Sequence, residues 1–225
     1  MTGKKKDWLY CNNDTDKSNP KFFKKCITNV ADVINKNGPY DFVALQEASN
    51  YRLLINESEH LQIMKHKIGR SGSENIITFW DPVKYKLIKS INGSFQTGRP
   101  WTALIFENNL CFVNIHAGHY HFFALTQKLA ELISTLKKYI EINDYRIVIA
   151  GDFNNIINEN YTKLILSDKK FFMSKKRINT IRRFSSKDQM QFDHVIDSKN
   201  IPLKIHSSKV AELSSDHLPI IAILE

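Results

Sequence analysis

The sequence predicts an α/β fold, in which buried strands alternate with amphipathic helices. The clearest strand is the run Ile-Val-Ile-Ala at 147–150, whose apolar, mostly β-branched residues stop at Gly-Asp-Phe-Asn. Apolar residues recur at helical spacing in two segments, one with Phe23, Ile27, Val30, Ala31 and Ile34 and a longer one with Leu125, Leu129, Leu132, Ile133, Leu136 and Ile140. A central strand that ends on polar groups places them at the rim of the sheet, where ligands of α/β proteins bind.

The length favours one domain that spans residues 1–225, which we expect to be monomeric. No apolar run is long enough to cross a membrane, and no apolar stretch follows the charged N-terminus. We therefore expect no transmembrane segment, no signal peptide and an intracellular location, either cytoplasmic or nuclear. The three cysteines are far apart, which predicts free thiols in a reducing compartment.

The net charge of +9 favours a polyanionic partner: nucleic acid, a phospholipid head group or an inositol phosphate. Lysine heavily outnumbers arginine, so compositional drift on a solvated surface explains part of this charge equally well. The segment 169–187 interleaves basic residues with phenylalanines, which is typical of a nucleic-acid surface and also of an exposed lysine-rich loop.

The first part of the chain is expected to hold a short strand at 8–11 that ends at Asn12. A helix follows at about 19–36, because asparagine caps a helix and proline suits its first position. Strand 41–47 then ends on Glu47, and acidic side chains are rarely buried without a partner. A strand-end glutamate beside a strand-end aspartate is a common way to assemble a Mg²⁺ site.

The middle of the chain is expected to contain a short helix at 49–58 and several strands. The expected strands cover residues 61–68, 74–80, 85–91, 101–106 and 110–115. Asn108-Asn109 makes a tight hairpin turn between the last two. The last strand leads to His116, with His119 and His121 just after it. Because no nearby cysteine or glutamate completes a zinc site, we interpret one of these histidines as functional and two as incidental.

The last part of the chain is expected to hold the long helix to about residue 143, the central strand and a helix at 158–166. Strand 192–196 carries Asp193, and Asp216-His217 precede a final apolar strand. Asp152 and Asn154 point to the same side while the backbone stays extended, and there they can hold a water molecule. The alternative is a strand that simply ends in an Asx-type turn.

In their order and spacing, these strand-end residues resemble the endonuclease/exonuclease/phosphatase superfamily. The matching pieces are Leu45-Gln46-Glu47, Asn114-Ile115-His116, Gly151-Asp152-Phe153-Asn154, Phe192-Asp193-His194 and Ser215-Asp216-His217-Leu218-Pro219. They span nearly the whole chain, and the combination of Gly-Asp-Phe-Asn with Ser-Asp-His-x-Pro is highly specific. His116 and Glu74 make the chain most similar to the deoxyribonuclease I branch, although the paired cysteines of that enzyme are absent. The Trp-Cys pattern of inositol 5-phosphatases is absent before Asp193.

The resemblance implies a four-layer sandwich, with two mixed β-sheets packed face to face and helices outside. It also implies a Mg²⁺-dependent phosphodiesterase, in which Mn²⁺ or Ca²⁺ can substitute, that hydrolyses DNA or RNA by in-line attack of water. The alternative function is a phosphatase or phospholipase C-type hydrolase of a small phosphoester or a sphingomyelin-like lipid.

The resemblance also implies a role for each site residue. Asp152 positions or deprotonates the attacking water and is oriented with Asn154. The two histidines are a general acid and a general base or phosphate clamp, in an assignment that stays open, and their partner carboxylates are expected to raise their pKa. The implied pairs are His116 with Glu74 and His217 with Asp193. The implied metal ligands are Glu47, Asn12 and Asp216, and the implied phosphate contacts are Arg99, Asn114 and Thr180.

Overall fold

The computed structural model describes residues 20–157, 171–174, 178, 180, 191–199, 203–207 and 217–224. Within these ranges the helices are α1 (Pro20–Asn37), α2 (Tyr51–Glu57), α3 (Glu59–Gln62) and α4 (Phe122–Leu136). The strands are β1 (Phe42–Leu45), β2 (Lys65–Ser71), β3 (Glu74–Trp80), β4 (Leu87–Ser94), β5 (Pro100–Phe106), β6 (Leu110–His116), β7 (Arg146–Asp152), β8 (Phe172–Met173), β9 (Asp193–Asp197), β10 (Leu203–Ser207) and β11 (Ile220–Leu224).

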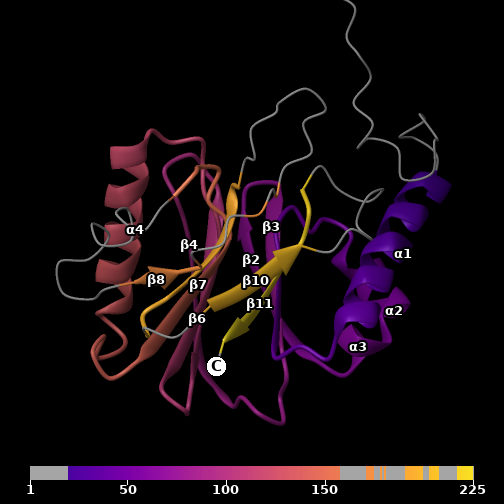
Figure 1. Cartoon of the computed structure of the whole chain (residues 1–225), viewed down its shortest axis with the longest axis horizontal. Coiled ribbons are helices and arrows are strands. Elements are labelled where there is room, and N and C mark those ends of the chain that lie inside the picture. Colours follow the sequence, from indigo (N-terminus) through magenta and orange to yellow (C-terminus); the bar gives the residue numbers. More distant parts are fainter. Residues whose placement is uncertain are drawn as a thin grey trace, which may run out of the picture.

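The strands form two main sheets and a hairpin. The larger sheet has six strands in the order β4-β5-β6-β7-β9-β8, and the smaller has three in the order β1-β3-β2. Within the described residues β6 and β7 run parallel, whereas the other paired strands are antiparallel. The parallel pair follows from α4, because a helical crossover returns the chain to the same end of the sheet. β10 and β11 pair with each other (Figure 1).

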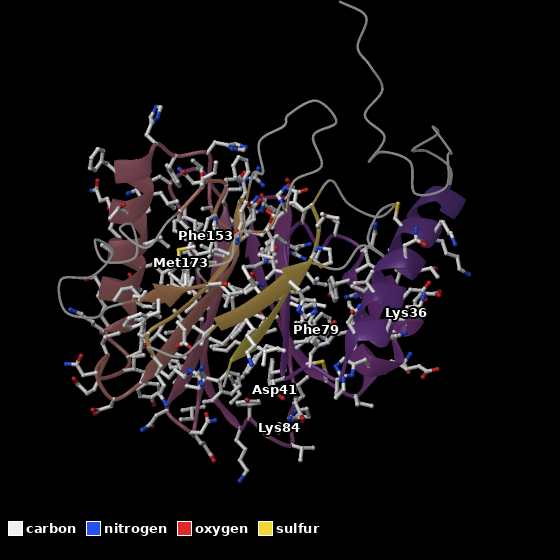
Figure 2. The ribbon with its side chains drawn as sticks, viewed as in Figure 1. Lys36, Asp41, Phe79, Lys84, Phe153 and Met173 are labelled. Atoms are coloured by element: carbon white, nitrogen blue, oxygen red, sulfur yellow. The ribbon has the colours of Figure 1, made fainter. Side chains whose placement is uncertain are left out.

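Hydrophobic clusters hold four layers together. One cluster lies between α4 and the six-stranded sheet around Phe153, and another packs α1, α2 and α3 against the three-stranded sheet around Phe79. Figure 1 shows α4 at one side and α1, α2 and α3 at the other, and Figure 2 shows Phe153 and Phe79 in the two corresponding positions. Between the sheets, the rings of Phe42 and Phe112 stack with centroids 4.5 Å apart. The predicted α/β sandwich of two sheets with helices outside is therefore confirmed.

Most of the predicted elements lie close to where the sequence placed them. The expected strand at 61–68 is wrong in its first half, because α3 occupies residues 59–62 and β2 starts only at Lys65. The hydroxyl of Ser58 caps α3 by accepting a hydrogen bond from the backbone N–H of Leu61. The predicted hairpin turn is confirmed, since Asn109 adopts a φ of 56° between β5 and β6. The long helix ends earlier than expected, at Leu136, and the expected elements at 8–11 and 158–166 lie outside the described residues.

The sequence led to one expectation about the cysteines and one about membrane-spanning segments. Cys26 is disulfide-bonded, so the prediction that all the cysteines are free thiols is wrong; Cys111 is a buried thiol on β6. In the part of the chain that the structure describes, no helix has the length and apolar composition needed to span a membrane.

Gly151, which precedes the aspartate at the end of β7, is required by close packing. Its φ is 138°, and a Cβ atom there would overlap the carbonyl oxygen of Ile115 on β6. Gly151→Ala is therefore expected to lower the free energy of unfolding by about 3 kcal/mol or more, measured by urea denaturation. Gly72→Ala is the matched control, because Gly72 also has a positive φ but faces open space; it should cost about 1 kcal/mol. Equal losses in the two variants would contradict the packing argument.

Candidate active site

The register of the large sheet brings three residues that are distant in sequence into one row. The parallel pairing of β6 with β7 sets His116 opposite Asp152, and the antiparallel pairing of β7 with β9 sets Asp152 opposite Asp193. Residues directly opposite one another project from the same face of a sheet. Asn114, one pleat deeper on β6, bonds to the backbone of Leu45 and Ile77, so this face looks toward the three-stranded sheet. The row therefore lies where the two sheets meet.

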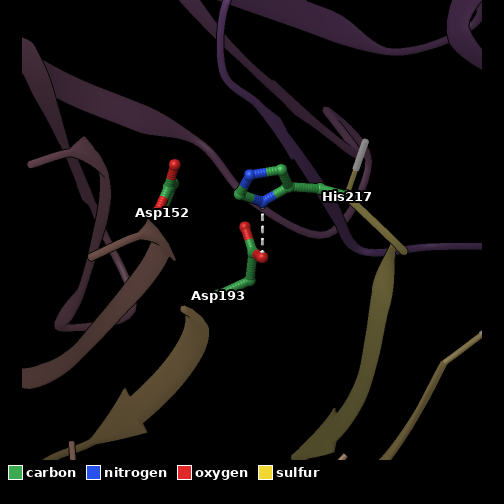
Figure 3. A group of neighbouring side chains, drawn as sticks. All are labelled: Asp152, Asp193 and His217. Atoms are coloured by element: carbon green, nitrogen blue, oxygen red, sulfur yellow. Dashed lines mark hydrogen bonds and ion pairs between the residues drawn. The ribbon is translucent and has the colours of Figure 1, made fainter. Parts of the chain in front are cut away.

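Asp152, Asp193 and His217 form the first group of the site. Nδ1 of His217 lies 2.7 Å from Oδ2 of Asp193, in a hydrogen bond that orients the imidazole ring (Figure 3). Asp152 lies beside this pair, and one ligand atom from each of the three residues falls within 4.8 Å of the other two. His217 precedes β11, so this group unites residues of β7, β9 and the C-terminal hairpin.

Glu47, Glu74, Arg99 and His116 form the second group. Nη1 of Arg99 donates to Oε2 of Glu74 at 2.6 Å and to Oε1 of Glu47 at 3.3 Å. Nδ1 of His116 contacts Oε1 of Glu74, which places the predicted His116–Glu74 pair in contact. Glu47 follows β1 with a φ of 52°, a conformation that costs energy for a residue other than glycine and is common at functional sites.

His116 joins the two groups. Its Nδ1 contacts Glu74 of the three-stranded sheet, while its Nε2 lies 3.4 Å from Oδ2 of Asp152 on the neighbouring strand. The side chain is almost completely buried, and both ring nitrogens face carboxylate groups of the protein. The site is thus one continuous network of acidic, basic and imidazole groups across both sheets.

Burial changes the protonation of two central residues. It raises the pKa of Asp152 to about 7, and the neighbouring charge of Asp193 acts in the same direction. Burial, with the positive charge of Arg99 as the next cause, lowers the pKa of His116 to about 3. The expectation that Glu74 raises the pKa of His116 is therefore wrong. At neutral pH His116 is therefore a neutral imidazole, which suits it to orient a neighbour and makes it a poor proton acceptor.

Asn154 adopts the turn geometry that the sequence left as an alternative. Its φ is 49°, and its backbone N–H donates to Oδ1 of Asp152 at 2.7 Å, as in an Asx-type turn. Its side-chain Nδ2 donates to the carbonyl oxygen of Ala117 at 2.7 Å. Asn155, which is not among the predicted site residues, likewise donates to the carbonyl oxygen of Tyr120 at 2.8 Å. Both side chains connect the loop after β6 to the end of β7. The closeness of Asn155 to Asp152 in the sequence was the signal that could have identified it.

Asn114 and Thr180 have no exposed surface, which does not fit the expected contacts with phosphate. The amide nitrogen of Asn114 donates to Ile77 O and Thr78 Oγ1, and its oxygen accepts from Gln46 at 2.7 Å. The hydroxyl of Thr180 accepts hydrogen bonds from the backbone N–H groups of Phe192 and Asp193. We therefore correct their roles: Asn114 links the two sheets below the site, and Thr180 positions Asp193. Gln46 was also missed as a member of this link.

The donor atoms of the site fit a divalent cation. Asp152, Asp193 and His217 offer two carboxylates and an imidazole in one group, and Glu47 offers another carboxylate whose side chain is 70% exposed. Carboxylate oxygens are the preferred ligands of Mg²⁺ and Mn²⁺. The remaining predicted ligands, Asn12 and Asp216, lie outside the described residues.

In sequence, the chain is similar to an uncharacterized viral protein. No protein-family model matches the chain. An uncharacterized protein of Acanthamoeba polyphaga mimivirus is 30% identical over 92% of this chain, and the match spans 45% of that protein, so the chain covers about half of its relative's length.

Two solved structures illustrate the structural similarity. An endonuclease/exonuclease/phosphatase from Bacteroides vulgatus superposes with a TM-score of 0.69 at 19% identity, covering 91% of this chain and 93% of that one. A mannosyl-6-phosphatase from Bacteroides thetaiotaomicron superposes with a TM-score of 0.68 at 15% identity, covering 96% and 97%. Together with the two-sheet sandwich described above, these similarities show that the chain has the fold of the endonuclease/exonuclease/phosphatase superfamily.

Proposed function

We propose that the protein is a metal-dependent phosphodiesterase that hydrolyses DNA or RNA. The observation that carries the proposal is the row of His116, Asp152 and Asp193, completed by His217, at the meeting edge of the two sheets. These residues supply two groups that hydrolysis of a phosphodiester requires, a base near its working pKa and a cation for phosphoryl charge, and Glu47 offers a place for a metal ion. The net charge of +9 supports a polyanionic substrate.

Asp152 is the residue we assign to accept the proton of the attacking water. A pKa of about 7 allows the carboxylate to take up a proton near neutral pH. Its Oδ1 is held by the backbone N–H of Asn154, which fixes the orientation of the carboxylate. On its other side, Oδ2 lies 3.4 Å from Nε2 of the neutral His116 ring.

His217 is the residue we assign to the phosphoryl oxygens or the leaving group. The carboxylate of Asp193 accepts a hydrogen bond from its Nδ1, which orients the imidazole ring beside Asp152. Asp193 also favours the protonated imidazolium, because an adjacent negative charge stabilises it. Arg99 is a second cationic group of the same site.

A bound Mg²⁺, with Mn²⁺ or Ca²⁺ as substitutes, would neutralise charge on the phosphoryl oxygens. We assign Glu47 as its main ligand, with Asn12 and Asp216 as the other ligands predicted from the sequence. Glu47 is favoured because its carboxylate is largely exposed and its contact with Arg99 is long. In contrast, Asp193 and His217 are already hydrogen-bonded to each other, with Nδ1 of His217 2.7 Å from Oδ2 of Asp193.

The proposal is tested by incubating the purified protein with supercoiled plasmid and with labelled single-stranded DNA and RNA. We expect cleavage that requires Mg²⁺ or Mn²⁺ and stops when EDTA is added. Parallel reactions with a small phosphomonoester and with sphingomyelin vesicles test the alternative phosphatase or phospholipase C-type function. Hydrolysis of either of these by well-folded protein that leaves all nucleic acids intact would overturn the nuclease assignment.

A further inference from the structure

We propose that Arg99 competes with the divalent cation for the carboxylate of Glu47, and that cation binding turns the guanidinium toward the substrate phosphate. This inference rests on the proposed function, which assigns Glu47 as a metal ligand. It adds a coupling between metal binding and phosphate binding through one side chain.

A single nitrogen of Arg99 carries three contacts. Nη1 lies 2.6 Å from Oε2 of Glu74, 3.3 Å from Oε1 of Glu47 and 3.2 Å from Nδ1 of His116. The two carboxylates belong to different elements, since Glu47 follows β1 and Glu74 begins β3. One positive charge is therefore shared between two negative charges at the proposed cation site.

The two ion pairs differ in length and exposure. The bond to Glu74 is short, and the side chain of Glu74 is 18% exposed, whereas the contact to Glu47 is long and that side chain is 70% exposed. Short charge-assisted hydrogen bonds are the stronger ones, and exposed ion pairs contribute little. Glu74 therefore holds Arg99 in the site, and the contact between Arg99 and Glu47 is the one that a cation replaces.

A cation on Glu47 lies close to the guanidinium, and the two positive charges repel each other. Arginine cannot relieve this repulsion by losing a proton, because it stays charged at any ordinary pH. The guanidinium must move off Glu47 while Glu74 keeps it within the site. The group then turns to an anion, for which its planar donors are well suited. By reciprocity of binding, a phosphate held by Arg99 strengthens cation binding.

The test measures Mn²⁺ affinity by isothermal titration calorimetry, without substrate. Arg99→Gln removes the competing charge and is expected to bind Mn²⁺ about 5- to 10-fold more tightly than the wild type. Arg99→Lys keeps the charge and should stay within about twofold of the wild type. Arg52→Gln, a loss of the same charge from an exposed position on α2, should leave the affinity unchanged. Unchanged or weaker binding by Arg99→Gln would overturn the inference.

A second measurement uses the wild-type chain and so does not depend on how the variants fold. On addition of Mg²⁺ the side-chain Nε–H NMR signal of Arg99 is expected to shift, while that of Arg146, which is paired with Asp197 at the other end of β7, stays in place. A static Arg99 signal in metal-bound protein would also overturn the inference.

The outcomes separate this inference from the proposed function. If Glu47→Gln abolishes Mn²⁺ binding and Arg99→Gln leaves it unchanged, the metal site stands and only the competition is wrong. If the wild-type protein binds no divalent cation at all, the metal-dependent function fails and the inference fails with it.

Discussion

Asp152→Asn is expected to lower kcat for metal-dependent nucleic-acid cleavage by about 10²–10⁴-fold, the range typical of general-base catalysis. Asparagine keeps the shape of the side chain, and its oxygen can still accept the hydrogen bond from the N–H of Asn154. It cannot take up the proton of an attacking water. Single-turnover cleavage of a labelled oligonucleotide measures the loss directly.

The same substitution is expected to leave the fold intact. The pKa of Asp152 is raised because burial disfavours the ionised carboxylate, so a neutral side chain does not destabilise the folded state. Urea unfolding should therefore give a free energy equal to or above that of the wild type. Asp144→Asn, which changes an exposed carboxylate away from the site, is the matched control and should keep full activity. Activity of Asp152→Asn within tenfold of the wild type would reject Asp152 as the base.

Asp193→Asn is expected to lower kcat by about 10³-fold, because an isosteric neutral side chain no longer stabilises the imidazolium of His217. The hydrogen bond between the two side chains is 2.7 Å long, so the loss should act through His217. Single-turnover rates of His217→Ala and of the double variant complete the measurement.

The double variant decides whether Asp193 and His217 work as a unit. If they do, the double variant is about as slow as the slower single variant, because residues in one network give non-additive effects. Losses that simply multiply would mean that Asp193 acts on the reaction independently of His217.

Local sequence pattern was sufficient for most elements of the fold. The apolar run at 147–150 became the interior of β7, and the helical spacing from Leu125 became α4. The incorrect prediction of a strand at 61–68 also has a local cause. Ser58 caps a helical turn there, and Leu61 is buried as part of that turn and not as part of a strand. Short apolar segments satisfy either periodicity, and a capping residue decides between them.

Within the site, the sequence pattern predicted which residues are present better than it predicted what each of them contacts. Asp152 and Asn154 were expected to act together from one side of an extended strand. The positive φ of Asn154 ends the extended backbone and sends its amide to Ala117 instead. The burial of Asn114 and Thr180 likewise changed two expected phosphate contacts into internal supports.

By itself, the sequence predicted most of the strands in chain order and the polar residues that end or follow β1, β6 and β7, because strand periodicity and chain breaks are local properties. The strands β8 and β10 were not predicted. Only the tertiary structure decided which of these residues meet. The parallel and antiparallel registers of β6, β7 and β9 align His116, Asp152 and Asp193, and the approach of the two sheets brings Arg99 onto Glu47 and Glu74. Burial within this assembly then set the pKa values of Asp152 and His116. These properties depend on pairings between distant segments and on exclusion of water, and neither is encoded in any short stretch of the chain.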